Sequence, residues 1–152
     1  MYFTQSTGSI MKAHMDGSNL ATFVTGLSSP AGVVIDHTSQ RLYWADAGAG
    51  VIQYSSLNDG EAVVTVNQTS SAPWGIALSG QRLYWSLKDE NQVSSSAKVG
   101  GDICIMYTGS DPITHLVENS MLPSNRANDC RGQTCDGLCV LTATSFTCLA
   151  KN

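Results

Sequence analysis

The residues with the clearest chemical potential are the cysteines, of which the chain of 152 residues has five. Four of them lie close together near the C-terminal end: Cys130, Cys135, Cys139 and Cys148. Such local density is typical of a disulfide-linked module from an oxidising compartment, whereas zinc sites favour paired Cys-x2-Cys spacings. Four cysteines allow three pairings, so the spacing alone leaves the connectivity open. Cys104 lies far from this group and has no obvious partner in the sequence.

The carboxylates do not form a catalytic pattern. Asp36, Asp46 and Asp59 lie where strands are expected to end, a position from which some hydrolases hold a calcium ion. All three precede turns rich in Gly, Ser or Thr, however, and an Asp in a turn usually caps the local backbone. The chain also lacks Gly-x-Ser-x-Gly, His-Glu-x-x-His and phosphate-loop motifs. We therefore expect no enzyme, no metal site and no cofactor.

Two further features are candidates for modification and for pH sensing. Asn67 begins an Asn-Gln-Thr sequon, which predicts a glycosylation site in a secreted protein. His14, His37 and His115 are isolated from one another in the sequence. An imidazole suits an acid-triggered switch, but no pattern brings these three together. Ordinary surface positions are the alternative for all three histidines.

Composition excludes several classes of partner. The net charge of −4, the pI near 5.1 and the absence of a Lys/Arg cluster give no reason to expect nucleic acid. No apolar run approaches the roughly 18 residues of a membrane span. The first residues lack the basic and apolar regions of a signal peptide, although the cysteines indicate an oxidising compartment. We resolve this conflict by expecting an internal piece of a longer protein, with any membrane anchor outside this chain.

An internal repeat predicts the fold. The pentapeptide Gln-Arg-Leu-Tyr-Trp occurs at 40–44 and again at 81–85, and a weaker copy begins at Tyr2. A period of about 40 residues with four short strands per unit is the signature of a β-propeller blade. The expected strands are 2–4, 9–13, 22–24, 31–35, 41–45, 51–54, 62–66, 73–78, 82–86, 92–96, 103–107 and 112–117. They make two whole blades, one blade without its innermost strand and one opening strand. We therefore predict an all-β chain that forms only part of a ring.

The repeats resemble a known family. Tyr43-Trp44-Ala45-Asp46, followed by Asp-Gly and by Pro-x-Gly with an apolar strand, is similar to the YWTD or class B repeat of low-density lipoprotein receptor relatives. The resemblance implies about half of a six-bladed ring. Tyr43, Trp44, Tyr84 and Trp85 then belong to the cores between blades. It also implies that Asp46 ties neighbouring blades through backbone hydrogen bonds, a role that Leu87 cannot take in the next copy.

The C-terminal segment resembles the EGF-like module that follows such propellers. The four clustered cysteines are similar to its first four, which implies the pairs Cys130–Cys139 and Cys135–Cys148. The resemblance divides the chain into a partial propeller at 1–120, a linker at 121–129 and a truncated EGF-like module at 130–152. Ala150 stands where the fifth cysteine of such a module is expected.

The family suggests a function in binding. It implies an extracellular ligand-binding region of a low-density lipoprotein receptor-like protein, with protein ligands and the rest of the parent propeller as partners, acting in endocytosis or signalling. A nidogen-like matrix or adhesion propeller that links proteins is the alternative, and a calcium-dependent propeller hydrolase is a third. Trp74 follows Pro73 at the entry to an innermost strand, near the expected channel rim. An exposed aromatic there is a usual anchor for a ligand, with core packing as the alternative.

Overall fold

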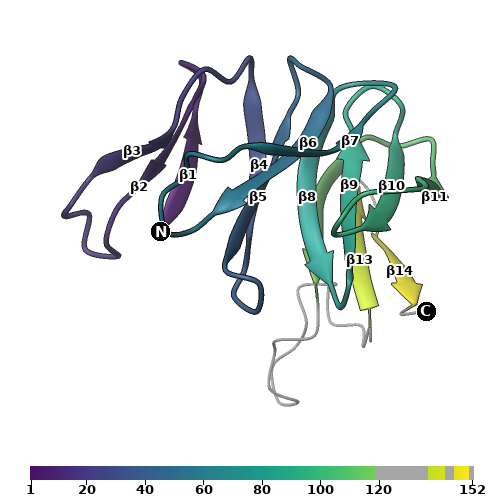
Figure 1. Ribbon diagram of the computed structural model, residues 1–152. Helices are drawn as coiled ribbons and strands as arrows, with labels where there is room; N and C mark the ends of the chain where they lie inside the picture. Colours follow the sequence, from purple (N-terminus) through teal and green to yellow (C-terminus); the bar gives the residue numbers. More distant parts are fainter. Residues whose placement is uncertain (119–136, 143–145, 151–152) are drawn as a thin grey trace.

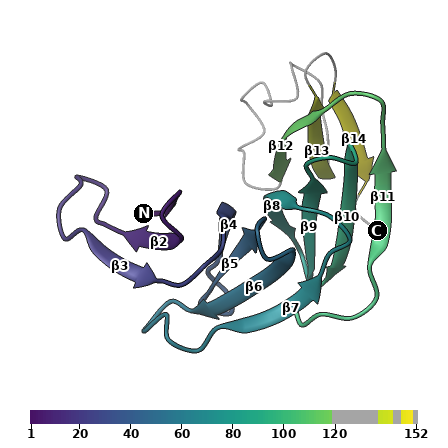
Figure 2. The same cartoon turned by 90° about the horizontal axis from the view of Figure 1, so that it is seen from above.

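The computed structural model describes residues 1–118, 137–142 and 146–150, and every regular element in these ranges is a β-strand. The strands form four antiparallel sheets in which neighbours in sequence pair with one another. Figures 1 and 2 show the sheets side by side, like blades of an incomplete fan. The predicted all-β architecture with a repeated antiparallel unit is confirmed. Within the described residues, no helix is long and apolar enough to cross a membrane.

Two of the sheets hold four strands each, as the repeat predicts. The second sheet contains β4 (Pro30–Asp36), β5 (Arg41–Asp46), β6 (Val51–Ser56) and β7 (Val64–Gln68). The third sheet contains β8 (Pro73–Ser79), β9 (Arg82–Leu87), β10 (Gln92–Ala97) and β11 (Cys104–Thr108). The strand β7 begins two residues later than expected, because the Val63 N–H donates to Glu61 O at 3.2 Å in a tight turn.

The first and fourth sheets hold three strands each. The first contains β1 (Tyr2–Gln5), β2 (Ser9–Lys12) and β3 (Ala21–Val24), without an innermost strand, as the repeat predicts. The fourth contains β12 (Ile113–Glu118), β13 (Gly137–Thr142) and β14 (Phe146–Ala150). The strand β12 matches the expected opening strand at 112–117.

The strands β13 and β14 come from the segment predicted as an EGF-like module. They pair with each other, and β13 also pairs with β12, with Leu116 opposite Val140. A module separate from the sheets therefore stays a prediction, as do the domain limits. In the backbone register Cys139 lies opposite Cys148, while Cys130, Cys135 and the expected linker lie outside the described residues. The two implied disulfides also stay predictions.

The faces of neighbouring sheets meet in apolar cores. Successive side chains on a strand point to opposite faces, so the Tyr-Trp pair of β5 serves two cores at once. Trp44 packs with Ile10 and Phe23 of the first sheet, and Tyr43 packs with Trp85 of the third. Tyr43, Trp44 and Trp85 are fully buried.

Tyr84 continues this arrangement on the opposite face of the third sheet. It is buried with Val93 of the same sheet and with Val140 of β13. The described hairpin therefore covers the face of the third sheet that the next blade of a propeller would cover.

A buried carboxylate ties the connection between the first two sheets. Asp46, at the end of β5, is only 2% exposed, and its oxygens accept hydrogen bonds from the backbone N–H groups of Ser28 and Ser29, both at 2.8 Å. Ser28 and Ser29 lie between β3 and β4. This is the role that the resemblance implies for Asp46. At the corresponding place in the third sheet stands Leu87, whose side chain has no acceptor.

Different polar contacts join the second and third sheets. Lys98, in the β10–β11 connection, forms an ion pair with Asp36 at the end of β4, with a distance of 2.7 Å between Nζ and Oδ2. The backbone of Asp36's own turn also holds this carboxylate, because the N–H groups of Thr38 and Ser39 donate to Oδ1. Burial raises the pKa of the Asp36 carboxyl, but hydrogen bonds from Lys98 and Ser39 outweigh it and lower the pKa from 3.8 to about 2. The turn predicted from the sequence is therefore also a link between blades.

The Pro-x-Gly motif allows the innermost strands to converge. A Cβ atom added to Gly32 of β4 would lie 2.7 Å from the Trp74 carbonyl oxygen and 3.0 Å from the Ile76 nitrogen, both on β8. Backbone atoms cannot move aside as a flexible side chain can, so only glycine fits here. This close approach draws β4 and β8 together at the inner side of the fan.

Replacing Asp46 by Ala is expected to destabilise the fold strongly. The substitution removes the carboxylate that accepts from the backbone N–H groups of Ser28, Ser29 and Ala49. The loss of these hydrogen bonds to a charged group costs roughly 2 to 5 kcal/mol in the free energy of unfolding. Urea unfolding followed by tryptophan fluorescence measures the loss. Asp59→Ala is the matched control, because Asp59 is an exposed turn residue that only caps Glu61 N, and its effect should stay within about 0.5 kcal/mol. Equal effects of the two substitutions would contradict the role of Asp46.

The Asp36–Lys98 pair predicts a loss of stability in acid. Because the pKa of Asp36 is lower in the folded chain than its ordinary value, its contribution is complete above 3.8 and disappears as the pH falls through about 2. The contribution at neutral pH is about 2 kcal/mol. Urea unfolding of the unmodified chain and of Asp36→Asn should differ by this amount near pH 6 and by less than about 1 kcal/mol near pH 2. A difference that is independent of pH would show that the ion pair does not cause it.

Candidate ligand-binding site

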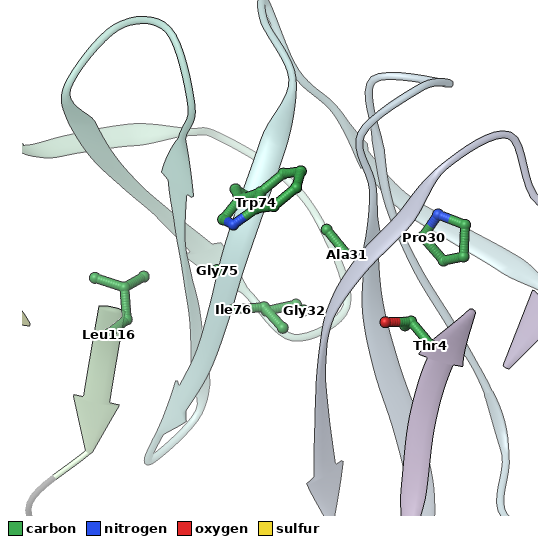
Figure 3. Close-up of a pocket in the computed structure, with 8 residues that line it drawn as sticks. All are labelled: Thr4, Pro30, Ala31, Gly32, Trp74, Gly75, Ile76 and Leu116. Carbon is green, nitrogen blue, oxygen red and sulfur yellow. The ribbon is translucent and has the colours of Figure 1, made fainter. Parts of the chain in front are cut away.

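A pocket with a volume of about 410 Å³ lies where the innermost strands converge. Its walls come from β4, β8 and β12, with one residue from β1. Figure 3 shows the residues that line it, which are Thr4, Pro30, Ala31, Gly32, Trp74, Gly75, Ile76 and Leu116. The pocket therefore joins four sheets that are far apart in the sequence.

A bulge in β8 turns Trp74 toward this pocket. The pairing of β8 with β9 shifts register between Pro73 and Ile76, so the two residues between them leave the regular alternation. Pro73 remains fully buried, and the N–H of Gly75 donates to Ser86 Oγ at 3.0 Å. Trp74, held between these fixed neighbours, lines the pocket (Figure 3).

The second sheet repeats the same device with a smaller residue. The β4–β5 pairing shifts register between Pro30 and Val33, and Ala31 stands at the position that Trp74 takes in β8. Both residues line the pocket. The middle residue of each Pro-x-Gly motif therefore faces the central pocket. A large residue such as Trp74 fills part of this pocket, whereas a small one such as Ala31 leaves room in it.

Trp74 is positioned in advance of any ligand. Its side chain is 43% exposed, and the ammonium group of Lys88 lies over the indole, 4.7 Å from the ring centroid. The N–H of Lys88 donates to Ala72 O at 2.9 Å, which anchors the residue beside the ring. A cation over an indole face is attracted by the ring quadrupole and restrains its orientation. Less ordering entropy is then lost when a partner packs against Trp74.

The walls of the pocket suit binding rather than acid–base chemistry. Among the described residues that line it, none has a titratable side chain, and Thr4 supplies the one side-chain hydroxyl. Mostly apolar side chains around a rigid aromatic group favour a ligand that buries an apolar or aromatic side chain, while the polar atoms also exposed in the pocket can accept or donate hydrogen bonds. In the described part of the chain, no cluster of three or more His, Cys, Asp or Glu side chains has the geometry to hold a metal ion.

The structure does not unite the other predicted residues with this pocket. His14 lies after β2 and is within hydrogen-bond distance of Asn19 Nδ2, and His37 lies in the exposed β4–β5 turn. Cys104 is an exposed free thiol on β11. The side chain of His115 lies outside the described residues.

Asn67 occupies a position unlike that expected for a glycosylation site. It is 9% exposed and lies between the second and third sheets. In the amide orientation that satisfies every neighbour, its nitrogen donates to the carbonyls of Val66 and Gly101 at 3.1 Å, and its oxygen accepts from Ser96 Oγ. An attached glycan would break these bonds. The strand β7 turns the side chain of this asparagine inward, which the sequon alone does not reveal.

Sequence comparisons find that the chain is similar to parts of receptor proteins. No protein-family model matches it. The vitellogenin receptor of Solenopsis invicta is 29% identical over 143 residues, which cover 91% of this chain and 8% of that receptor. Low-density lipoprotein receptor-related protein 5 of Mus musculus is 27% identical over 151 residues, covering 92% of this chain and 9% of that protein. The predicted resemblance to the low-density lipoprotein receptor-related family is confirmed. The chain spans less than a tenth of the length of these relatives.

A structural comparison supports the same fold. A chain in the crystal structure of a nidogen/laminin complex superposes with a TM-score of 0.75 at 22% identity, and the match covers 93% of this chain and 52% of that one. The fold is that of a YWTD-type β-propeller. Coverage of about half of the neighbour agrees with the predicted part of a ring.

Sequence reasoning singled out Trp74, which lines this pocket, but missed the residues around it. Ligand contact by Trp74 stays a prediction. Thr4, Leu116 and Lys88 come from segments that nothing in the sequence connects to Trp74. The repeat offered one usable signal, because aligning the two Pro-x-Gly motifs places Ala31 opposite Trp74 in the same role. Lys88 and Leu116 carry no such signal.

The buried position of Asn67 predicts little glycosylation of the folded chain. Secretion from eukaryotic cells, followed by intact-mass measurement before and after glycosidase treatment, is expected to show a mostly unmodified Asn67. Ala21→Thr provides a matched control, because it creates an Asn-Leu-Thr sequon at the exposed Asn19. Full modification of Asn67 in a chain as stable as the unmodified one would contradict the interior position of its amide.

Proposed function

We propose that the chain forms part of an extracellular region that binds protein ligands in a low-density lipoprotein receptor-like protein. In this role the propeller supplies a rigid surface and performs no catalysis. The parent receptor takes part in endocytosis or signalling and carries its membrane anchor outside this chain. The similarity to receptors over most of the chain supports this proposal.

The observation that carries the proposal is the exposed Trp74 in an apolar pocket. An aromatic side chain that is fixed by its neighbours and open to solvent is typical of the residues that dominate binding energy at protein interfaces. The absence of titratable side chains among the described lining residues is consistent with binding without chemistry. Lys88 beside the ring adds a positive charge at the edge of the site, which favours ligands with an acidic group close to an apolar one.

A matrix linker is the second candidate. The likeness to a chain in a nidogen/laminin complex supports it, because the superposition includes nearly the whole chain. In that role the same surface would join two extracellular proteins permanently instead of releasing a ligand. Both candidates predict the same anchor and differ in the partner.

Binding to two probes tests the proposal. The immobilised chain is exposed to vitellogenin and, separately, to laminin, and biolayer interferometry measures each dissociation constant. Trp74→Ala is expected to weaken the productive interaction roughly 30-fold, as removal of an aromatic anchor does. Leu20→Ala is the control, because Leu20 is an exposed apolar residue just before β3 that does not line the pocket.

The outcomes separate the two candidates. Vitellogenin binding that depends on Trp74 favours the receptor, and laminin binding that depends on Trp74 favours the matrix linker. Binding of either probe that Trp74→Ala and Leu20→Ala affect equally would contradict the central site. Failure of both probes to bind would count against both named ligand types.

A further inference from the structure

The second and third sheets treat their buried tryptophans differently. In the second sheet, Trp44 of β5 lies opposite Gln53 of β6, and its Nε1–H donates to Gln53 Oε1 at 3.1 Å. The amide nitrogen of Gln53 in turn donates to Thr65 Oγ1 on β7. This chain of bonds satisfies the indole and fills the face of the sheet.

The third sheet lacks both polar partners. By register, Trp85 of β9 lies opposite Ser94 of β10, and Ser94 lies opposite Ile105 of β11. The serine side chain is shorter than glutamine by several atoms, and isoleucine has no acceptor. Trp85 is fully buried, and its Nε1–H has no hydrogen-bond partner in the described structure. A buried donor without a partner is rare in folded proteins and calls for an explanation.

A pocket of about 200 Å³ lies at this place. Trp85, Leu87 and Ser94 of the third sheet line it, together with Ile103 and Ile105 at the outer side of the fan. Ile105 is 65% exposed, so the pocket is open toward solvent beside an apolar surface. Space that Gln53 and Thr65 occupy in the second sheet is therefore empty in the third.

We propose that this pocket binds an uncharged amide side chain, glutamine or asparagine, from a partner protein. The carbonyl oxygen of the amide accepts from Trp85 Nε1, as Gln53 Oε1 does from Trp44. The methylene groups contact Leu87, Ile103 and Ile105. The site is lined by residues of β9, β10 and β11 and shares no lining residue with the central pocket, so it does not depend on the function proposed for Trp74.

The composition of the pocket selects against charged occupants. Its lining residues comprise Trp, Leu, Ile, Ser, Thr and Gln side chains, without a charged group among the described ones. A carboxylate would lose its hydration without gaining a counter-ion, and an ammonium group would offer no acceptor to the indole. An amide offers the acceptor and also donates to a hydroxyl such as that of Ser94.

The pocket is open to solvent, but a ligand reaches the indole nitrogen only after a lining side chain has moved. The indole nitrogen itself is closed to solvent. Gln92 lines the pocket and donates from Nε2 to Ser94 Oγ at 2.8 Å. It is a flexible side chain, and an incoming amide replaces its hydrogen bond to Ser94 with one of the same kind.

The indole N–H signals test the proposal directly. The chain has three tryptophans, so a proton–nitrogen correlation spectrum of the full chain contains three indole signals, which single substitutions assign. Propionamide, which reproduces the end of a glutamine side chain, is expected to shift the Trp85 signal saturably with a dissociation constant in roughly the millimolar range. Propionate and propylamine should bind at least about tenfold more weakly, because each lacks one part of the recognised chemistry.

Two substitutions serve as matched controls, because each places the residue of one sheet at the equivalent position of the other. Ser94→Gln supplies an internal amide, so the Trp85 signal should shift without any probe and the response to propionamide should weaken at least about tenfold. Gln53→Ser should create the same pocket beside Trp44 and make the Trp44 signal respond to propionamide. Should Gln53→Ser fail to fold, the titrations of the unmodified chain and of Ser94→Gln decide the matter.

Three results would overturn the proposal. One is a Trp85 signal that propionamide leaves unchanged while its N–H exchanges rapidly with solvent, since water alone would then satisfy the indole. Another is an equal response to propylamine, which would show that the acceptor is irrelevant. The third is an undiminished response in Ser94→Gln, which would place the binding elsewhere.

Discussion

The constraint on which the structure depends is that both faces of every blade must be covered. The Tyr-Trp pair on the second strand of a blade imposes this, because alternation sends one large aromatic side chain to each face. Tyr43 and Trp44 thereby join the second sheet to both neighbours, and Tyr84 and Trp85 do the same for the third. The described hairpin of β13 and β14 covers the outer face of Tyr84, so this face is not left to solvent.

Different polar residues can join neighbouring blades, whereas the apolar cores use the same Tyr-Trp pair in both complete blades. The loss of the motif Asp at Leu87 suggested from the sequence that blade-to-blade contacts weaken there. The structure instead joins the second and third sheets through the Asp36–Lys98 pair and the buried amide of Asn67. None of these residues belongs to the repeat motif. A motif position therefore shows where one link is made, but its absence does not show that the link is missing.

The strands were largely predictable, whereas the site was predictable only in part. Strand positions follow from local alternation and from turn residues, and the repeat supplied two independent copies of each. The pocket depends on register shifts at Trp74 and Ala31 and on the packing of Thr4 and Leu116, which are long-range properties. Similarly, the sequon at Asn67 says nothing about the face to which β7 turns its side chain. The missing hydrogen-bond acceptor of Trp85 was predictable in part, because aligning the two repeats places Ser94 where the first repeat has Gln53.

The Pro-x-Gly motif that lets the innermost strands approach each other also forms the central pocket. Gly32 allows β4 and β8 to converge, and the bulge at each Pro-x-Gly motif turns the residue before the glycine toward the centre. The bulge occurs in both the second and the third sheet, so the residue before the glycine faces the centre in both, whether it is Ala31 or Trp74. Selection for binding then needs to change only that residue, as the difference between Ala31 and Trp74 illustrates. The pocket beside Trp85 also results from a single residue difference between equivalent positions. Gln53 fills the space beside Trp44 in the second sheet, whereas the shorter Ser94 leaves the equivalent space beside Trp85 open.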